Sequence, residues 1–299
     1  MSRIFCPSSI HAAFVAGEAF LGSKPLLTPV NSEQKWLLDS VFSRRDALRL
    51  LKPEEMNSWA DNDAKRLNAV LKAEGMDIKL DEFKEDGFGI VGVTHVGVEW
   101  VEVGTKAGIM DSSGKIFSAV HMLPHTSYKI GNKYELVTRF EVLMSGVHAH
   151  PVVCLFTKTK DRYYLTVAEE EPIGDVELCR RTEEIRSSLS PTSDHYEFLI
   201  FPMVDLDISG DIDWLKGIGT KDFVLDQAKK QAKFKMNHEG AVFKDAFAGG
   251  FAVTSIARPK FIVINQPFLL WSERDGVPYP LLSAYIDQEH WKDPGNLSL

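Results

Sequence analysis

The 299-residue sequence predicts a single α+β domain over residues 1–299. Helical patterns dominate its first part, and strand patterns that suit antiparallel pairing dominate the rest. No internal repeat or low-complexity linker interrupts this order, so the sequence shows no domain boundary. With 44% hydrophobic and 25% charged residues, the chain is expected to be globular and to bury a large core.

Helical spacing of apolar residues predicts five helices, three of them near the start of the sequence. They cover residues 6–25, 32–51, 53–75, 175–189 and 211–218. For the first helix, Ser8 or Ser9 is the expected N-cap. Gly22 followed by Pro25 is expected to end it, because glycine adopts the left-handed conformation and proline cannot continue a helix.

Strand predictions rest on β-branched and aromatic runs bounded by turn residues. They cover residues 88–104, 115–123, 134–146, 150–157, 195–208 and 260–287, and residues 226–237 fit either a strand or a helix end. Residues 88–104 predict either a buried strand pair or one long central strand. The sequence DGVPYP, residues 275–280, predicts a hairpin turn.

Composition narrows the possible partners and the setting. A net charge of −8 argues against nucleic acid as a main partner, and no apolar run is long enough to cross a membrane. The first residues lack the apolar core of a signal peptide. Cys6, Cys154 and Cys179 are odd in number and widely spaced, which fits a reducing environment. We therefore expect a cytoplasmic or otherwise intracellular protein, with unconventional release as an open alternative.

The segment DLDISGDIDWLK, residues 205–216, carries the sharpest local motif. Its aspartates, serine and glycine fall where an EF-hand calcium loop places oxygen ligands and a turn. However, Lys216 stands where that loop needs a bidentate glutamate, and Pro202 lies in an entering segment with a strand pattern. A calcium-binding α+β protein is therefore a remote alternative, and a strand that ends in a turn is the simpler interpretation.

No catalytic set stands out from the sequence. His148 and His150 could ligate a metal from one strand face, but no third ligand stands at a spacing typical of a metal site. Cys6 precedes a predicted helix and lies near His11, yet its apolar neighbours favour a structural cysteine over a nucleophile. We therefore predict no enzyme activity, no catalytic residue, no metal and no cofactor.

Three motifs follow one another towards the end of the sequence: Glu239-Gly240 after a strand pattern, Pro267-Phe268 27 positions after Gly240, and Asp293-Pro294. Together they resemble the C-terminal part of the serpins, the serine protease inhibitor family. In that family a strand runs into an acidic-glycine hinge, an exposed reactive-centre loop follows, and the next strand carries a Pro-Phe pair. Pro294 also resembles a proline near the end of the family's sequences.

The resemblance extends upstream in the family's order. Residues 3–24 resemble the segment that opens its buried central helix, with Cys6 in place of a serine. Residues 54–71 resemble the helix that crosses the large sheet, and residues 98–104 resemble the central strand of that sheet. The resemblance implies helices around a large, mostly antiparallel sheet, two smaller sheets and an exposed reactive-centre-like loop.

The sequence also departs from the family pattern. It is short between Gly22 and Phe88, which implies a shortened serpin without the first helix and some N-terminal elements. The resemblance places Cys6, Ser9 and Lys230 in the region that controls opening of the large sheet in the family. Lys230 or Gln231 falls about where the family has a buried histidine, so the opening mechanism is in question.

An inhibitory serpin traps a protease when the cleaved loop inserts into the large sheet as a new strand. The resemblance assigns the hinge to Glu239, Gly240, Ala241, Val242, Phe243, Lys244, Asp245 and Ala246. Strand side chains alternate between two faces, so either Lys244 or Asp245 would be buried on insertion. Burying an unpaired charge is unfavourable and would slow the insertion.

The family's cleavage position falls within the candidates Thr254, Ser255, Ile256 and Ala257. We predict a weak or non-inhibitory serpin that binds a protein partner, because the hinge is bulky and charged. An active suicide inhibitor of a serine or cysteine protease is the alternative, because the loop length is preserved.

Overall fold

The computed structural model describes residues 1–130, 133–159, 161–241 and 260–298. Its largest sheet has seven strands in the order β1-β19-β18-β11-β10-β9-β12, and neighbouring strands are antiparallel. The strands are β1 (Arg3–Phe5), β9 (Phe140–Ser145), β10 (His148–Phe156), β11 (Arg162–Val167), β12 (Leu189–Pro191), β18 (Phe268–Glu273) and β19 (Leu282–Ile286).

Both faces of this sheet are buried, which explains its continuous apolar runs. Val153 and Leu155 of β10 belong to the largest hydrophobic cluster, on one face. Val152 and Cys154 pack on the other face, against the cluster formed with α4 (Asp175–Ser187). Because side chains alternate along a strand, a sheet covered on both sides needs apolar residues at successive positions.

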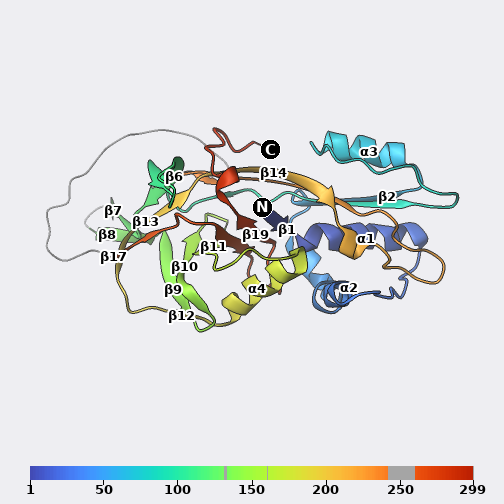
Figure 1. Ribbon diagram of the computed structural model, residues 1–299, viewed down its shortest axis with the longest axis horizontal. Helices are drawn as coiled ribbons and strands as arrows, with labels where there is room; N and C mark the ends of the chain where they lie inside the picture. Colours follow the sequence, from blue (N-terminus) through green and yellow to red (C-terminus); the bar gives the residue numbers. More distant parts are fainter. Residues whose placement is uncertain (131–132, 160, 242–259, 299) are drawn as a thin grey trace.

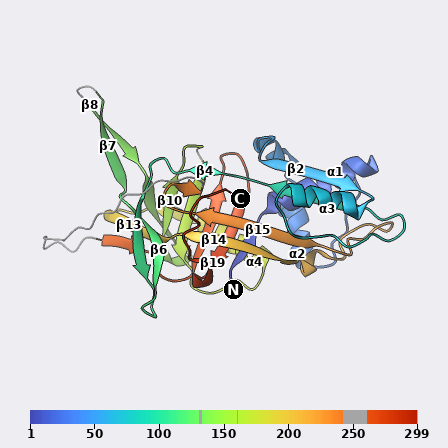
Figure 2. The same ribbon diagram turned by 90° about the horizontal axis from the view of Figure 1, so that it is seen from above.

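A second sheet has the order β17-β13-β6-β5. Its strands are β5 (Thr105–Met110), β6 (Ile116–Met122), β13 (Tyr196–Pro202) and β17 (Lys260–Val263). β13 and β17 are parallel, whereas the other neighbours are antiparallel. The hairpin of β7 (His125–Ile130) and β8 (Lys133–Thr138) extends away from this part of the body (Figure 2).

Three antiparallel strand pairs form the remaining β-structure. They are β2 (Met56–Asp61) with β3 (Gly89–Thr94), β14 (Val204–Asp211) with β15 (Lys229–Met236), and β4 (Val98–Glu99) with β16 (Gly240–Ala241). Figure 1 shows α3 (Ala64–Ala73) above β2 and α1 (Pro7–Leu21) below it. Apolar side chains of α3 pack on β3 from the outside through Leu67, Leu71, Val91 and Val93.

A further hydrophobic cluster lies under α2 (Ser32–Leu37). The chain continues from α2 as a π-helical turn at Leu38–Phe42 and, after a break, as a 3-10 helix at Arg45–Leu50. These turns bury Leu37, Val41 and Leu48 against residues 212–218 and 277–281. Among the described residues, no helix is both long and apolar enough to cross a membrane.

The α+β class and most strand positions agree with the sequence predictions, but three details are wrong. Cys6 is the N-cap residue of α1, with Pro7 in the first turn, and Ser9 donates its hydroxyl back to the Cys6 carbonyl. Residues 56–61 form β2 because they pair along their whole length with β3. Tertiary pairing here overrides the local helical pattern.

The third detail concerns the calcium alternative. Val204–Asp211 forms strand β14, paired in register with β15, whereas an EF-hand needs a loop that wraps around the ion. Lys216 also bridges Asp211 at 3.1 Å and Asp213 at 2.7 Å, so a cation already occupies the place beside these carboxylates. The calcium interpretation of this segment is therefore wrong.

Arg274 joins three separate parts of the fold. Its guanidinium donates to Glu55 at 2.5 and 2.9 Å and to Asp161 at 2.8 Å twice. We expect Arg274→Met to lower the free energy of unfolding by about 3–5 kcal/mol, because two buried carboxylates lose their counter-ion. Arg162→Met is the control, since Arg162 makes an exposed 3.9 Å pair with Asp275 worth about 0–1 kcal/mol. If urea unfolding gave the same loss of free energy for both variants, the stabilising role of Arg274 would be contradicted.

His11 gives the stability a defined pH dependence. His11 is 1% exposed, its ring stacks on Phe42 at a centroid distance of 5.0 Å, and burial lowers the pKa of His11 from 6.5 to about 4. The unfolded chain therefore binds this proton at higher pH, and stability falls as the pH drops from about 6.5 to about 4, by up to ~3 kcal/mol. The free energy of unfolding of His11→Leu should not show this fall between about pH 6.5 and pH 4. The same pH profile for the variant and the unaltered protein would refute the role of His11.

Candidate functional site

The central feature is a slot between β3 and β15. Among the described strands, β3 pairs with β2 and β15 pairs with β14, so the edges of β3 and β15 that face each other carry no strand-to-strand ladder. Gly92–Thr94 and Gln231–Lys233 line the two sides of a cavity of about 190 Å³. We call this cavity the slot. An added strand would find two open edges in it.

The N-terminal end of α1 forms the floor of the slot. Cys6 and Ser9 both line it. A Cβ atom on Gly92 would lie only 2.0 Å from the Ser9 carbonyl oxygen, so glycine is required for this close approach. The Ser8 and Thr94 hydroxyls lie 3.4 Å apart and link the helix to the end of β3. Two of the predicted sheet-opening residues are thus placed directly beneath the slot.

Lys230, the third predicted sheet-opening residue, lies on β15. Its ammonium group is 2.5 Å from the Asp175 carboxylate and 3.3 Å from the Ile4 carbonyl oxygen. Asp175 belongs to the first turn of α4, where a carboxylate also interacts favourably with the helix dipole. Lys230 therefore ties one wall of the slot to the body of the protein.

The chain that follows α3 covers the outer side of the slot. Glu74, Gly75 and Met76 line the cavity. Alternate side chains of residues 227–233 bond to the backbone of residues 75–81. The contacts are Lys233 to Gly75, Gln231 to Asp77, Lys229 to Lys79 and Gln227 to Asp81, at 2.6 to 2.8 Å. This cover was not predicted from the sequence, although polar residues alternate from 227 to 233.

The predicted hinge reverses the direction of the chain. After β15, the Asn237 amide donates to the Gly240 carbonyl at 3.0 Å, with His238 and Glu239 at the turn. The Trp100 indole donates to the Asn237 carbonyl at 3.0 Å, and the Trp100 amide donates to the Glu239 carbonyl at 3.1 Å. The buried Trp100 side chain, 1% exposed, therefore fixes the turn from below.

Gly240 begins the returning strand. Its φ of +154° lies where residues with side chains are rarely found, and an added Cβ would be 2.6 Å from the Val98 carbonyl oxygen. Gly240 lies opposite Glu99 in the antiparallel pair of β16 and β4. The predicted hinge residues Val242–Ala246 and the reactive-centre candidates Thr254–Ala257 lie outside the described residues.

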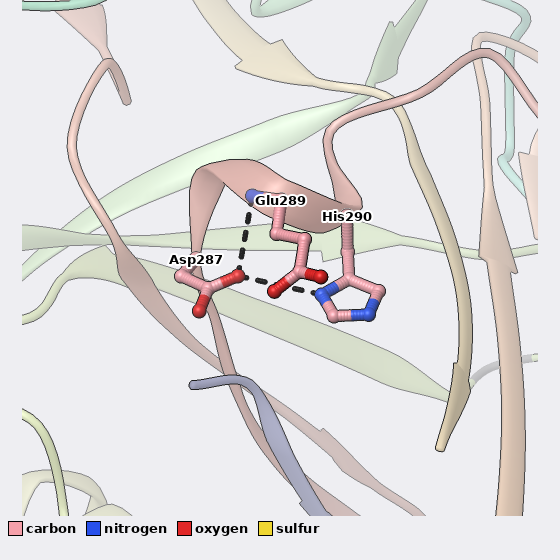
Figure 3. Close-up of side chains that lie close together, drawn as sticks. All are labelled: Asp287, Glu289 and His290. Carbon is pink, nitrogen blue, oxygen red and sulfur yellow. Dashed lines mark hydrogen bonds and ion pairs between the residues drawn. The ribbon is translucent and has the colours of Figure 1, made fainter.

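The remaining polar clusters have structural explanations. The His148 imidazole is 2.9 Å from the Thr166 hydroxyl and 3.2 Å from Glu169, inside the largest sheet. Figure 3 shows the other cluster, in which Asp287 accepts from the Glu289 amide at 3.2 Å and lies 3.3 Å from the His290 ring. Here Asp287 caps a one-turn 3-10 helix, which accounts for the proximity of the three side chains.

Close packing of α1 under the slot can be tested with a glycine pair. Gly92→Ala should lower the free energy of unfolding by about 1–3 kcal/mol, because the new methyl group would overlap the Ser9 carbonyl. Gly146→Ala is the matched control, since a Cβ there has no neighbour within 4 Å, and it should change stability by less than about 0.5 kcal/mol. Denaturant unfolding that ranks the two variants in the reverse order would refute the close approach.

No family model matches this chain, and no curated protein matches it in sequence. Solved structures do match. One is a thyroxine-binding globulin in complex with thyroxine, 11% identical, TM-score 0.55, with 95% of this chain and 92% of that chain covered. A second, human thyroxine-binding globulin complexed with thyroxine, is 12% identical, TM-score 0.55, with 95% and 91% covered.

A third match is Serpin48 from the insect Tenebrio molitor, 13% identical, with a TM-score of 0.49 and coverage of 94% of this chain and 97% of that chain. At such identities a likeness concerns the fold alone. The expected architecture is confirmed at that level: a mostly antiparallel set of large and smaller sheets with a few surrounding helices. The chain has a serpin-like fold.

Proposed function

We propose that this chain is a shortened member of the serpin family, with weak or no suicide inhibition, that acts by binding a protein partner. It has no catalytic residues of its own in this proposal. The register of β16 carries the argument, because it indicates which side chains of the hinge would turn inward if the loop entered the slot.

The inward face follows from two opposed residue pairs. Gly240 lies opposite the exposed Glu99, and residue 241 lies opposite Val98, which is 2% exposed. Directly opposed residues of an antiparallel pair point to the same face of a sheet. In an inserted strand that continues this register, odd-numbered residues would therefore face the core. Asp245 would be among them, and Lys244 would face outward.

Inward placement of Asp245 makes insertion unfavourable. A carboxylate moved from water into the core without a partner is costly. Phe243 and Phe247 would share this face and add bulk above α1, which already approaches Gly92 closely. The contacts that Gln231 and Lys233 make with the cover would also have to break. A protease that cleaved the loop would then finish hydrolysis before it was trapped.

The comparisons are compatible with a binding role. Two of the similar structures are globulins named for thyroxine, so this fold also serves proteins whose named task is binding. The alternative, an active inhibitor of a serine or cysteine protease, is favoured by one observation. Gly240–Ala241 already pairs with β4 at the C-terminal end of the slot, as the start of an added strand would.

Incubation with an elastase-like serine protease and with a cysteine protease separates these functions. We expect cleavage of the loop without an SDS-stable covalent complex, and little rise in melting temperature after cleavage. Asp245→Ala should increase the rise in melting temperature, because the inward charge is removed. Lys244→Ala is the matched control and should have little effect, because its side chain would face away from the core.

Two results would overturn the proposal. A stable covalent complex formed by the unaltered protein would make it an inhibitor. Equal effects of Asp245→Ala and Lys244→Ala on the melting temperature of the cleaved protein would show that the register of β16 does not continue into the slot.

A further inference from the structure

A second, larger cavity lies at the N-terminal ends of β3 and β15, away from the hinge. Its volume is about 680 Å³, within the range of small-molecule sites. The C-terminal half of α1, residues 83–90 before and within β3, and residues 222–227 before β15 form its walls. These three segments are far apart in the sequence, so the cavity exists only in the folded protein.

Aromatic side chains dominate one part of this cavity. The Phe20 and Phe88 rings stack with centroids 5.3 Å apart at 21°, and Phe223 meets Phe88 edge-on at 5.8 Å. Phe20 nevertheless remains 47% exposed. Neighbouring Leu21 and Val224 also line the cavity and are exposed. Such a gathering of accessible apolar surface around a concavity indicates a place where a flat apolar molecule can be buried.

The charged residues of the wall are mostly acidic. Glu18, Glu85, Asp86, Asp222 and Asp226 line the cavity, against one cation, Lys84. Glu18 pairs with Arg45, and Lys84 pairs with Asp226 at 2.8 Å. Within the described chain, the structure gives no ion pair to the other three carboxylates. The cavity therefore has an excess of negative charge beside its aromatic surface, which favours a cationic ligand.

We propose that this cavity binds a small molecule that combines a flat aromatic ring system with one positively charged group. The ring system contacts the Phe20, Phe88 and Phe223 side chains, and the charge interacts with the unpaired carboxylates of the wall. The site is separate from the hinge and does not depend on whether the chain inhibits proteases.

Three naphthalene probes that differ only in charge test this proposal: 1-naphthylmethylammonium, the uncharged 1-naphthylmethanol and the anionic 1-naphthylacetate. Calorimetric titration of the full chain should give the tightest binding for the ammonium, about tenfold tighter than for the alcohol, and the weakest for the carboxylate. Added salt should reduce the difference between the ammonium and the alcohol.

Variants locate the site. Phe20→Ala should weaken binding of the ammonium and of the alcohol alike, by about fivefold or more. Because Phe20 is 47% exposed, the variant should keep the melting temperature of the unaltered protein. Asp222→Asn should weaken binding of the ammonium probe and leave binding of the alcohol unchanged. Tyr134→Ala is the control, because it removes an aromatic ring that is 73% exposed on the distant β8 strand.

The proposal fails if none of the three probes binds, or if the alcohol and the carboxylate bind as tightly as the ammonium. It also fails if Tyr134→Ala weakens binding as much as Phe20→Ala does, because the probes would then bind unspecifically to exposed rings.

Discussion

Strands β3 and β15 face each other across the slot, and neither has a strand partner on that edge among the described residues. Backbone amide and carbonyl groups at a strand edge need hydrogen-bond partners or water. The protein neither closes the two halves into one sheet nor leaves the slot fully exposed. Instead α1 supports it from below, with Ser9 close to Gly92, and residues 75–81 cover it from outside through side chains of β15. The division of the sheet is therefore built into the packing.

Favourable and unfavourable free-energy contributions decide whether a strand can insert into the slot. An added strand would gain backbone hydrogen bonds on two edges, each worth about 0.5–1.5 kcal/mol net. It would lose the contacts of the cover and would bury Asp245, if the register of β16 continued. The turn at His238 and Glu239, held by Trp100, favours the start of such a strand. The turn is thus compatible with insertion, whereas in our proposal Asp245 opposes it.

The sequence predicted the parts of the fold that local pattern determines. Alternation and β-branched runs located β6, β10 and β13, and Glu239-Gly240 marked the reversal after β15. Residues 56–61 were missed, because MNSWAD becomes a strand only through pairing with β3. The role of Gly92 was also hidden, since it depends on a carbonyl of a helix more than eighty positions earlier in the chain. Sequence spacing contains no information about such close approaches.

A third cavity, of about 140 Å³, lies between the slot and the large cavity. It shares Phe14 and Ile90 with the large cavity, and Ser9 and Gly92 with the slot. The turn at residues 237–240 follows the C-terminal end of β15, whereas a ligand in the large cavity would contact the segments before the N-terminal ends of β3 and β15. A molecule bound across these ends would hold the two strands at one separation. By linkage, if insertion of a strand changed the affinity of the cavity for its ligand, the bound ligand would change the insertion equilibrium by the same factor.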